Sequence, residues 1–196
     1  MAERGSGIPV VVAGLGDVGR AIARSVLETP ELRLVAAGDP APGLAGGKLE
    51  SILNVPCPDL TVASDLAVAF AAARGGVLLQ ATHSSFEAVR PQIEQAVRAG
   101  LSVASTCEEL AYPFKKHPEI SEHLDSEAKE WGVAIVGTGV NPGFVMDKLV
   151  LTLAAVSQRV DSAKAVRIVD ASKRRMPLQK KIGAGMTVEE FKAKVA

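Results

Sequence analysis

A glycine-rich turn near the amino terminus constrains the fold more than any other feature of the chain. The stretch VVVAGLGDVGR, residues 10–20, joins an apolar segment to a helical pattern and spaces three glycines as Gly-x-Gly-x-x-Gly. In this spacing Gly14 permits a tight turn, Gly16 lets the backbone approach a pyrophosphate, and Gly19 lets the helix pack against the strand. Because the motif alone is a weak signal, the elements around it must decide whether it binds phosphate.

Apolar segments of strand length alternate with helical patterns along most of the chain. The strand candidates are residues 9–14, 32–39, 76–82, 101–106 and 132–140; the helix candidates are residues 17–29, 65–73, 89–99, 118–131 and 143–158. We place Pro91 near the first turn of its helix. This alternation predicts an α/β fold with a doubly wound parallel sheet. In such folds ligands bind beyond the carboxyl ends of the strands.

An acidic residue completes the dinucleotide pattern. Asp39 ends the second strand candidate 20 positions after Gly19, where a carboxylate accepts hydrogen bonds from a ribose 2′-hydroxyl and repels a 2′-phosphate. We therefore predict NAD as the cofactor, preferred over NADP, with Arg20 leaving some residual NADP use. The predicted cofactor-binding residues are Gly14, Gly16, Asp17, Val18, Gly19, Arg20, Asp39, Thr82 and Ser105.

The segment after the third strand candidate, ATHSS, contains small hydroxyl residues. Thr82 is suited to contact the nicotinamide ribose, and His83 is a candidate to donate a proton or a hydrogen bond to a substrate. The alternative interpretation is that Ser84 and Ser85 cap the following helix and that His83 is solvated. Both interpretations remain open from the sequence.

Two adjacent glutamates follow the fourth strand candidate in STCEELAYP, residues 105–113. Carboxylates at this place, Glu108 and Glu109, are candidates to hold a cationic substrate or to move a proton. The alternative is a solvated turn with no catalytic role. Cys107 lies between the fourth strand candidate and the two glutamates, and we expect it to be a small buried residue.

The carboxyl-terminal part shows a different pattern. The stretch GTGVNPGF, residues 137–144, predicts a shaped loop in which Asn141 contacts the substrate, or else simple helix initiation. Residues 161–172 carry charges within an apolar run, as a half-exposed strand of a second sheet would. A basic loop follows, and Thr187 with Glu190 predicts a capping box at the last helix. We expect a dinucleotide-binding domain over residues 1–145 and the beginning of a mixed α+β substrate and oligomerisation domain over residues 146–196.

Charge, cysteines and hydropathy exclude several classes of protein. The 22 basic and 22 acidic residues give a net charge of zero, which provides no reason to expect a nucleic acid or an anionic membrane as partner. Two cysteines make no disulfide framework, and no Cys or His pair has metal-ligand spacing. The amino terminus is too short and polar for a signal peptide, and no apolar run has the length of a membrane span. We therefore predict a cytoplasmic protein.

Four motifs taken together, VVVAGLGDVGR, STCEELAYP, GTGVNPGF and RRMPLQKKIGAGMT, resemble the 2,4-diaminopentanoate dehydrogenases over essentially all 196 residues. That family belongs to a wider group with a dihydrodipicolinate-reductase-type amino-terminal domain. The resemblance implies a Rossmann domain followed by a mixed sheet, and a homo-oligomer when full length. It also implies NAD(P)-dependent oxidative deamination of a small diamino acid in ornithine degradation.

The side chains suit that chemistry in outline. A base must take a proton from the substrate ammonium, a task that suits Glu108 or Glu109. A cation must hold the substrate carboxylate, a task for Arg174, Arg175 or Lys181 in the basic loop. The alternative for the basic loop is a solvated segment without a ligand.

Three other functions compete with this one. Dihydrodipicolinate reductase would carry a His-His pair and a Lys-Asp-Ala-Pro-Ser-Gly-Thr type motif; here the pair is missing, and Lys181, Gly185 and Thr187 echo the motif only loosely. A nucleotide-binding module without catalysis is a second alternative. A saccharopine- or homoserine-dehydrogenase-like enzyme is a third.

The end of the sequence also carries an expectation. A strand around residues 165–171 has few later segments to pair with, and the helix that starts at Thr187 runs to Ala196 without a stop signal. Members of the resembled family continue well beyond this point. We therefore expect a fragment that keeps the Rossmann fold, binds NAD weakly and turns over little or no diamino acid.

Overall fold

The structure, a computed structural model, describes residues 7–174 and 176–194. The chain divides into two compact units, Met1–Ala155 and Val156–Ala196. The first unit contains the whole sheet and the glycine-rich turn.

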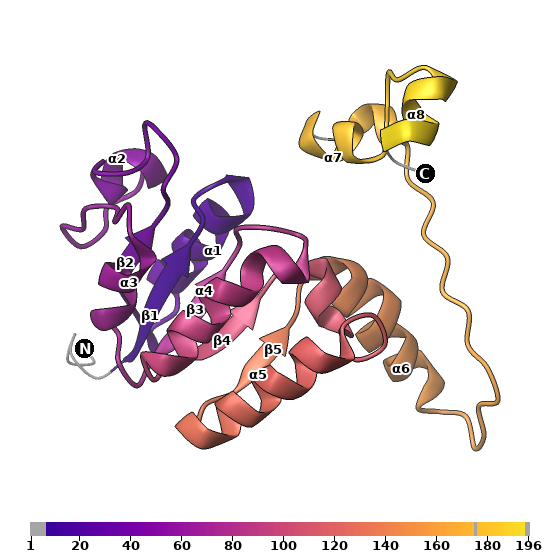
Figure 1. Cartoon of the computed structure of the whole chain (residues 1–196), viewed down its shortest axis with the longest axis horizontal. Helices are drawn as coiled ribbons and strands as arrows, with labels where there is room; N and C mark the ends of the chain where they lie inside the picture. Colours follow the sequence, from indigo (N-terminus) through magenta and orange to yellow (C-terminus); the bar gives the residue numbers. More distant parts are fainter. Residues whose placement is uncertain (1–6, 175, 195–196) are drawn as a thin grey trace. The chain divides into compact units, whose positions relative to one another are not determined.

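The first unit is built on a parallel sheet with the strand order β2-β1-β3-β4-β5 (Figure 1). Its strands are β1 (Ile8–Ala13), β2 (Leu32–Gly38), β3 (Val77–Gln80), β4 (Ser102–Ser105) and β5 (Ile135–Gly137). Every neighbouring pair is parallel. The chain moves outward to β2 and then returns to the other side of β1, so the topological switch point lies between β1 and β3. The predicted parallel sheet is confirmed.

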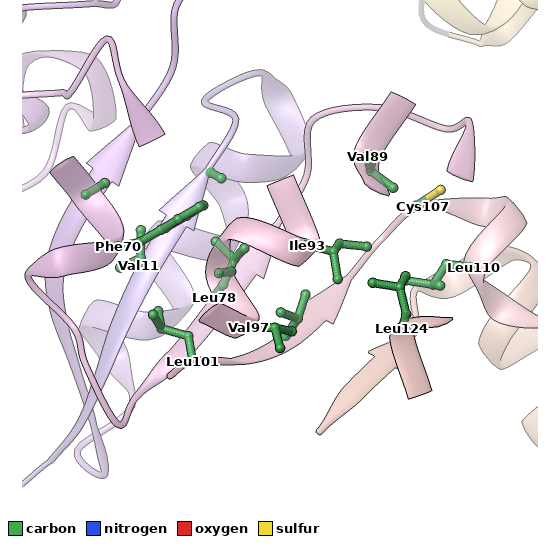
Figure 2. Packing of buried hydrophobic residues seen from close by; sticks show 14 of the residues in the cluster. Val11, Phe70, Leu78, Val89, Ile93, Val97, Leu101, Cys107, Leu110 and Leu124 are labelled. Carbon is green, nitrogen blue, oxygen red and sulfur yellow. The ribbon is translucent and has the colours of Figure 1, made fainter. Parts of the chain in front are cut away.

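Helices cover both faces of β1. Val10 and Val12 of β1 pack into one buried cluster with α1 (Asp17–Glu28) and α2 (Leu49–Leu53). Val11 and Ala13, which point to the opposite face, pack into a second cluster with α3 (Leu66–Ala71), α4 (Phe86–Arg98) and α5 (Pro118–Trp131). Figure 2 shows this second cluster, with Phe70 of α3 and Ile93 of α4 over the strands. A strand buried on both faces is apolar at every position, which is why β1 appears as a continuous aliphatic run.

The helix α4 differs from its predicted boundaries, and the helix α2 was not predicted. α4 begins at Phe86 rather than at residue 89, so Pro91 lies inside the helix and not in its first turn. The earlier start comes from the burial of Phe86, which is 0% exposed, and from a cap supplied by a distant residue. The five-residue α2 is too short to show a clear period in the sequence.

The segment after β5 forms a distorted helix, η2 (Val140–Lys148), followed by α6 (Leu149–Ala154). One continuous helix over residues 143–158 was predicted. The backbone at Asn141 is extended, with φ −144° and ψ 119°, and α6 ends at Ala154. None of the residues in η2 or α6 is buried.

The second unit corrects one prediction and confirms another. Residues 162–170 form no strand, because the described part of this unit contains no other strand that could satisfy their backbone groups. The short turn η3 (Ala171–Lys173) and α7 (Met176–Lys181) follow, the latter where a loop was predicted. α8 (Val188–Lys194) begins with the predicted capping box: Glu190 N–H donates to Thr187 Oγ1 at 3.2 Å, and Thr187 N–H donates to Glu190 Oε2 at 3.0 Å.

Residues 7–174 and 176–194 contain neither a membrane-spanning helix nor a cluster of metal-ligating side chains. No described helix is both long and apolar enough to cross a membrane. The same residues contain no group of three or more His, Cys, Asp or Glu side chains that could hold a metal ion.

Candidate active site

The carboxyl ends of the strands meet along one edge of the sheet. Backbone hydrogen bonds join neighbouring strand exits: Gly14 N–H donates to Gly38 O, and Ala81 N–H donates to Ala13 O. The same pattern continues toward β5, where Thr106 N–H donates to Gln80 O and Thr138 N–H donates to Ser105 O. The five loops that the sequence singled out therefore lie along a common edge, where ligands bind in folds of this type.

The three glycines of the turn have three different environments. Gly14 adopts φ +85°, and a Cβ there would lie 2.5 Å from Ala81 O. A Cβ on Gly19 would collide with the carbonyl of Gly14, so only glycine lets α1 approach the turn this closely. A Cβ on Gly16 would meet nothing within 4 Å. The space before Gly16, at the N-terminus of α1, suits the close approach of an anionic group.

Asp39 lies directly beside the glycine-rich turn. Its Oδ2 accepts a hydrogen bond from Leu15 N–H at 2.7 Å, and its Oδ1 accepts one from Ala41 N–H at 2.9 Å. Arg20 Nε donates to Leu15 O at 2.8 Å, so its guanidinium is folded back onto the same turn. Asp17 and Val18, the first two residues of α1, are exposed. The predicted carboxylate and the predicted cradle thus form one local unit.

A polar network lies under the loop that follows β3. Thr82 Oγ1 donates to Gln92 Oε1 at 2.8 Å, and Gln80 Nε2 donates to the same oxygen at 2.6 Å. The Thr82 proton is therefore directed inward, which leaves its oxygen as an acceptor. Gln80 is 1% exposed, and its Oε1 has no hydrogen-bond partner within the described structure. Gln80 and Gln92 were not predicted as site residues, although a glutamine at the end of an apolar strand is a usable signal.

His83 and Ser105 have opposite environments. His83 is exposed, and its ring makes no hydrogen bond or ion pair with the described residues. Ser105 is 1% exposed, and its Oγ accepts from Cys107 N–H at 3.1 Å. Ser105 therefore shapes the loop after β4, and its contact with a cofactor stays a prediction.

The loop after β4 runs into the single turn η1 (Glu108–Ala111). Glu108, at its start, is half-buried. Cys107 is buried, as expected, and its Sγ donates to Ser84 O at 3.1 Å. Burial raises the pKa of the Cys107 thiol, so this sulfur remains protonated and unreactive at neutral pH.

Glu109 points in a direction that the sequence did not indicate. Its Oε2 accepts a hydrogen bond from the backbone N–H of Phe86 at 2.8 Å, and its Oε1 accepts one from Lys116 Nζ at 2.5 Å. These two donors lower the pKa of the Glu109 carboxyl below its ordinary value. His117 Nε2 lies 3.7 Å from Oε2. Glu109 is therefore ionised and engaged on both oxygens.

The exit of β5 packs against η1. A Cβ on Gly137 would collide with the backbone of Leu110, so glycine is required where these segments meet. A cavity of about 440 Å³ lies between η1, α5 and β5, with mainly apolar walls that include Leu110, Leu124 and Ile135. Asn141, farther along the chain, is exposed. None of the predicted site residues lines this cavity.

The predicted cationic residues belong to the second unit. Arg174 is half-buried, and its carbonyl accepts from Gln179 Nε2 at 2.7 Å. Arg175 lies outside the described residues, and so does the side chain of Lys181. Their role toward a substrate carboxylate stays a prediction.

Comparison with known proteins links both parts of the chain to amine-oxidising enzymes. Residues 144–196 match the family model of the 2,4-diaminopentanoate dehydrogenase C-terminal domain. The chain is 29% identical over 186 residues to 2,4-diaminopentanoate dehydrogenase of Acetoanaerobium sticklandii, covering 94% of this chain and 52% of that protein. It is 31% identical over 180 residues to amine dehydrogenase of Streptomyces virginiae, covering 84% of this chain and 47% of the relative.

A solved structure gives the same fold. Amine dehydrogenase from Mycobacterium smegmatis superposes with a TM-score of 0.74 at 24% identity, covering 81% of this chain and 46% of that one. The chain spans about half the length of the curated relatives it matches. The match to the C-terminal domain model and the similarity along nearly the whole chain make this chain similar to the 2,4-diaminopentanoate dehydrogenases.

Proposed function

We propose that this chain binds a nicotinamide dinucleotide and takes part in the oxidative deamination of a small amino or diamino acid, with 2,4-diaminopentanoate as the substrate. The observation that carries the proposal is the contact between Asp39 and the turn: a carboxylate 2.7 Å from Leu15 N–H, next to the open space at Gly16. Ribose and pyrophosphate need this combination of an acceptor and a bare helix N-terminus. The 2,4-diaminopentanoate dehydrogenase and amine dehydrogenase relatives support the reaction class.

The residues present fit the dinucleotide. The amides at the start of α1 would face its pyrophosphate, Asp39 would accept from its ribose hydroxyl, and the Thr82 oxygen would accept from its nicotinamide end. The cofactor supplies the hydride acceptor. NAD is the proposed form, because the negative charge of Asp39 disfavours a 2′-phosphate.

The remaining chemistry belongs to the substrate and the protein. The carbon that bears the amine loses a hydride, its ammonium loses a proton, and water replaces nitrogen to give a ketone and ammonium. Glu108 and Glu109 lie at the strand exit where a proton must be accepted. His83, exposed at the neighbouring exit, is the further candidate for a hydrogen bond to substrate.

Binding and turnover measurements with this chain test the proposal. Calorimetric titration should show NAD binding, and Asp39→Ala should weaken it. Reduction of NAD that depends on added 2,4-diaminopentanoate supports the dehydrogenase. Binding of NAD without turnover on a panel of amines would favour a non-catalytic module. Turnover of dihydrodipicolinate with NADH would instead favour a reductase. This chain is 29% identical over 156 residues to 4-hydroxy-tetrahydrodipicolinate reductase of Synechocystis.

The proposed base is tested by substitution. Glu108→Gln keeps the size of the side chain and removes its basicity, so the turnover number should fall about 10²-fold or more. NAD affinity should remain unchanged, which the same titration checks. Full activity in Glu108→Gln would exclude proton transfer by this residue.

A further inference from the structure

The N-terminus of α4 is capped by a residue that lies 23 positions later in the chain. The first amides of a helix have no partner within the helix, and the residue just before it normally supplies one from its side chain. Ser85 occupies that position and makes no side-chain cap. Instead, Phe86 N–H donates to Glu109 Oε2 at 2.8 Å.

The same carboxylate joins a third segment. Lys116 Nζ lies 2.5 Å from Glu109 Oε1, and the His117 ring, only 10% exposed, approaches Oε2. His117 is the residue before α5, and its ring packs edge-on against Phe86 at 5.6 Å between centroids. Glu109 therefore contacts its own turn η1, the start of α4 and the segment leading into α5.

The backbone beneath Glu109 is fixed by further contacts. Glu109 N–H donates to Ser84 O at 3.5 Å, and Cys107 Sγ donates to the same carbonyl at 3.1 Å. Phe86 is 0% exposed, and Cys107 is 1% exposed. Cys107 and Val89 of α4 belong to the same buried cluster, and both are labelled in Figure 2. The loop between β3 and α4, which carries Thr82 and His83, is held by the loop after β4.

The charge state of Glu109 matches a fixed anchor and not a base. A general base works best when its pKa is near the working pH. Hydrogen bonds from Lys116 and Phe86 move the pKa of Glu109 downward, away from that range. The other titratable groups around it are His117, Glu87 beside His117, Cys107 and the adjacent Glu108.

We propose that Glu109 is a positioning residue: its carboxylate anchors the start of α4 and thereby sets the β3–α4 loop, and it does not accept the proton in the reaction. The assignment of proton transfer rests on the proposed function. The anchoring does not, because it follows from the contacts of Glu109 alone.

Backbone amide spectra of the ¹⁵N-labelled chain test the anchor without any turnover. The Phe86 amide shift should follow the titration of Glu109, with a midpoint below the ordinary glutamate range. Glu109→Gln should remove this step, Lys116→Gln should raise its midpoint, and Glu108→Gln should leave it unchanged. A step that persists in Glu109→Gln, or that disappears in Glu108→Gln, would overturn the proposal.

A kinetic comparison tests the division of roles. Glu109→Gln keeps an acceptor for Phe86 N–H, so its kcat should stay within about 10-fold of that of the unsubstituted chain. Glu109→Ala keeps no acceptor, so its kcat should fall further and its KM should rise. The pH dependence of kcat/KM should be the same in Glu109→Gln as in the unsubstituted chain. Loss of about 10²-fold with a changed pH profile in Glu109→Gln would make Glu109 the base. The amide titration needs no turnover, so it decides the anchor even if the unsubstituted chain turns over no diamino acid.

Discussion

The exits of β1 and β5 lie on the same edge of one sheet but are built in different ways. After β1, Leu15 is 0% exposed and Gly19 is buried against the Gly14 carbonyl. After β5, η2 and α6 contain no buried residue, and Leu151 and Leu153 are 69% and 68% exposed. The first exit is packed by neighbouring segments of the chain, whereas the other described residues of the first unit leave the apolar side chains of the second exit uncovered.

The difference shows which part of the site is determined locally. The contacts that shape the β1 exit, from Asp39 to Leu15 and from Arg20 to Leu15, span at most 24 positions. They come from a single β-α-β unit. The β5 exit is held by contacts over longer separations, between Gly137 and Leu110 and from Thr138 N–H to Ser105 O. The proposed cofactor end is therefore preformed within this unit, and the region around Asn141 is not.

The largest expected effect is at Gly19. Gly19→Ala would place a Cβ against the Gly14 carbonyl, which cannot move without shifting β1, so the free energy of unfolding should fall by about 3 kcal/mol. Urea unfolding followed by fluorescence of Trp131, the single tryptophan, measures this change. Gly16→Ala is the matched control, since its Cβ meets open space and should change stability by less than about 0.5 kcal/mol. Equal stability of the two variants would contradict the packing at this exit.

A slightly smaller effect is expected at Leu15. Leu15→Ala removes a fully buried side chain from the cluster that contains Val10 and Ala23, and should cost about 2.5 kcal/mol of unfolding free energy. The same urea titration measures it. A cost below about 1 kcal/mol would mean that the turn relaxes freely, and the β1 exit would then resemble the β5 exit.

Asp39→Ala tests whether the β1 exit prefers NAD over NADP. Removing the carboxylate should reduce the preference for NAD over NADP by about 10-fold, equivalent to about 1.4 kcal/mol. Parallel titrations with the two cofactors give the ratio. Asp39→Asn keeps an acceptor for Leu15 or Ala41 N–H and serves as the control for lost structure. Tighter binding of NADP than of NAD by the unsubstituted chain would refute the role of this charge.

The smallest effect is expected at the β5 exit. Leu151→Ala should change the free energy of unfolding by less than about 0.5 kcal/mol, because most of the side chain is already exposed. Leu15→Ala provides the contrast in the same assay. A cost similar to that of Leu15→Ala would show that α6 is packed in solution and would remove the difference between the two exits.

The order of the strands and helices in the first unit was predictable because its signals are local. Aliphatic runs with helical patterns between them predicted all five strands, and the glycine spacing predicted the turn between β1 and α1 that Asp39 contacts. The capping box of α8 was equally local, since Thr187 and Glu190 are three positions apart. Residues 162–170 were wrongly predicted as a strand, because pairing depends on a partner that local pattern does not reveal.

The sequence by itself determined the parallel sheet, the glycine-rich turn and the set of strand exits, because hydrophobic period and glycine spacing act over short distances along the chain. Only the tertiary structure distinguished Glu108 from Glu109, which are adjacent and chemically identical. Glu109 meets Phe86 from 23 positions before it and Lys116 from seven positions after it. Such contacts arise when strand exits converge at the edge of a sheet, and no pattern within STCEELAYP encodes which carboxylate will turn toward the helix.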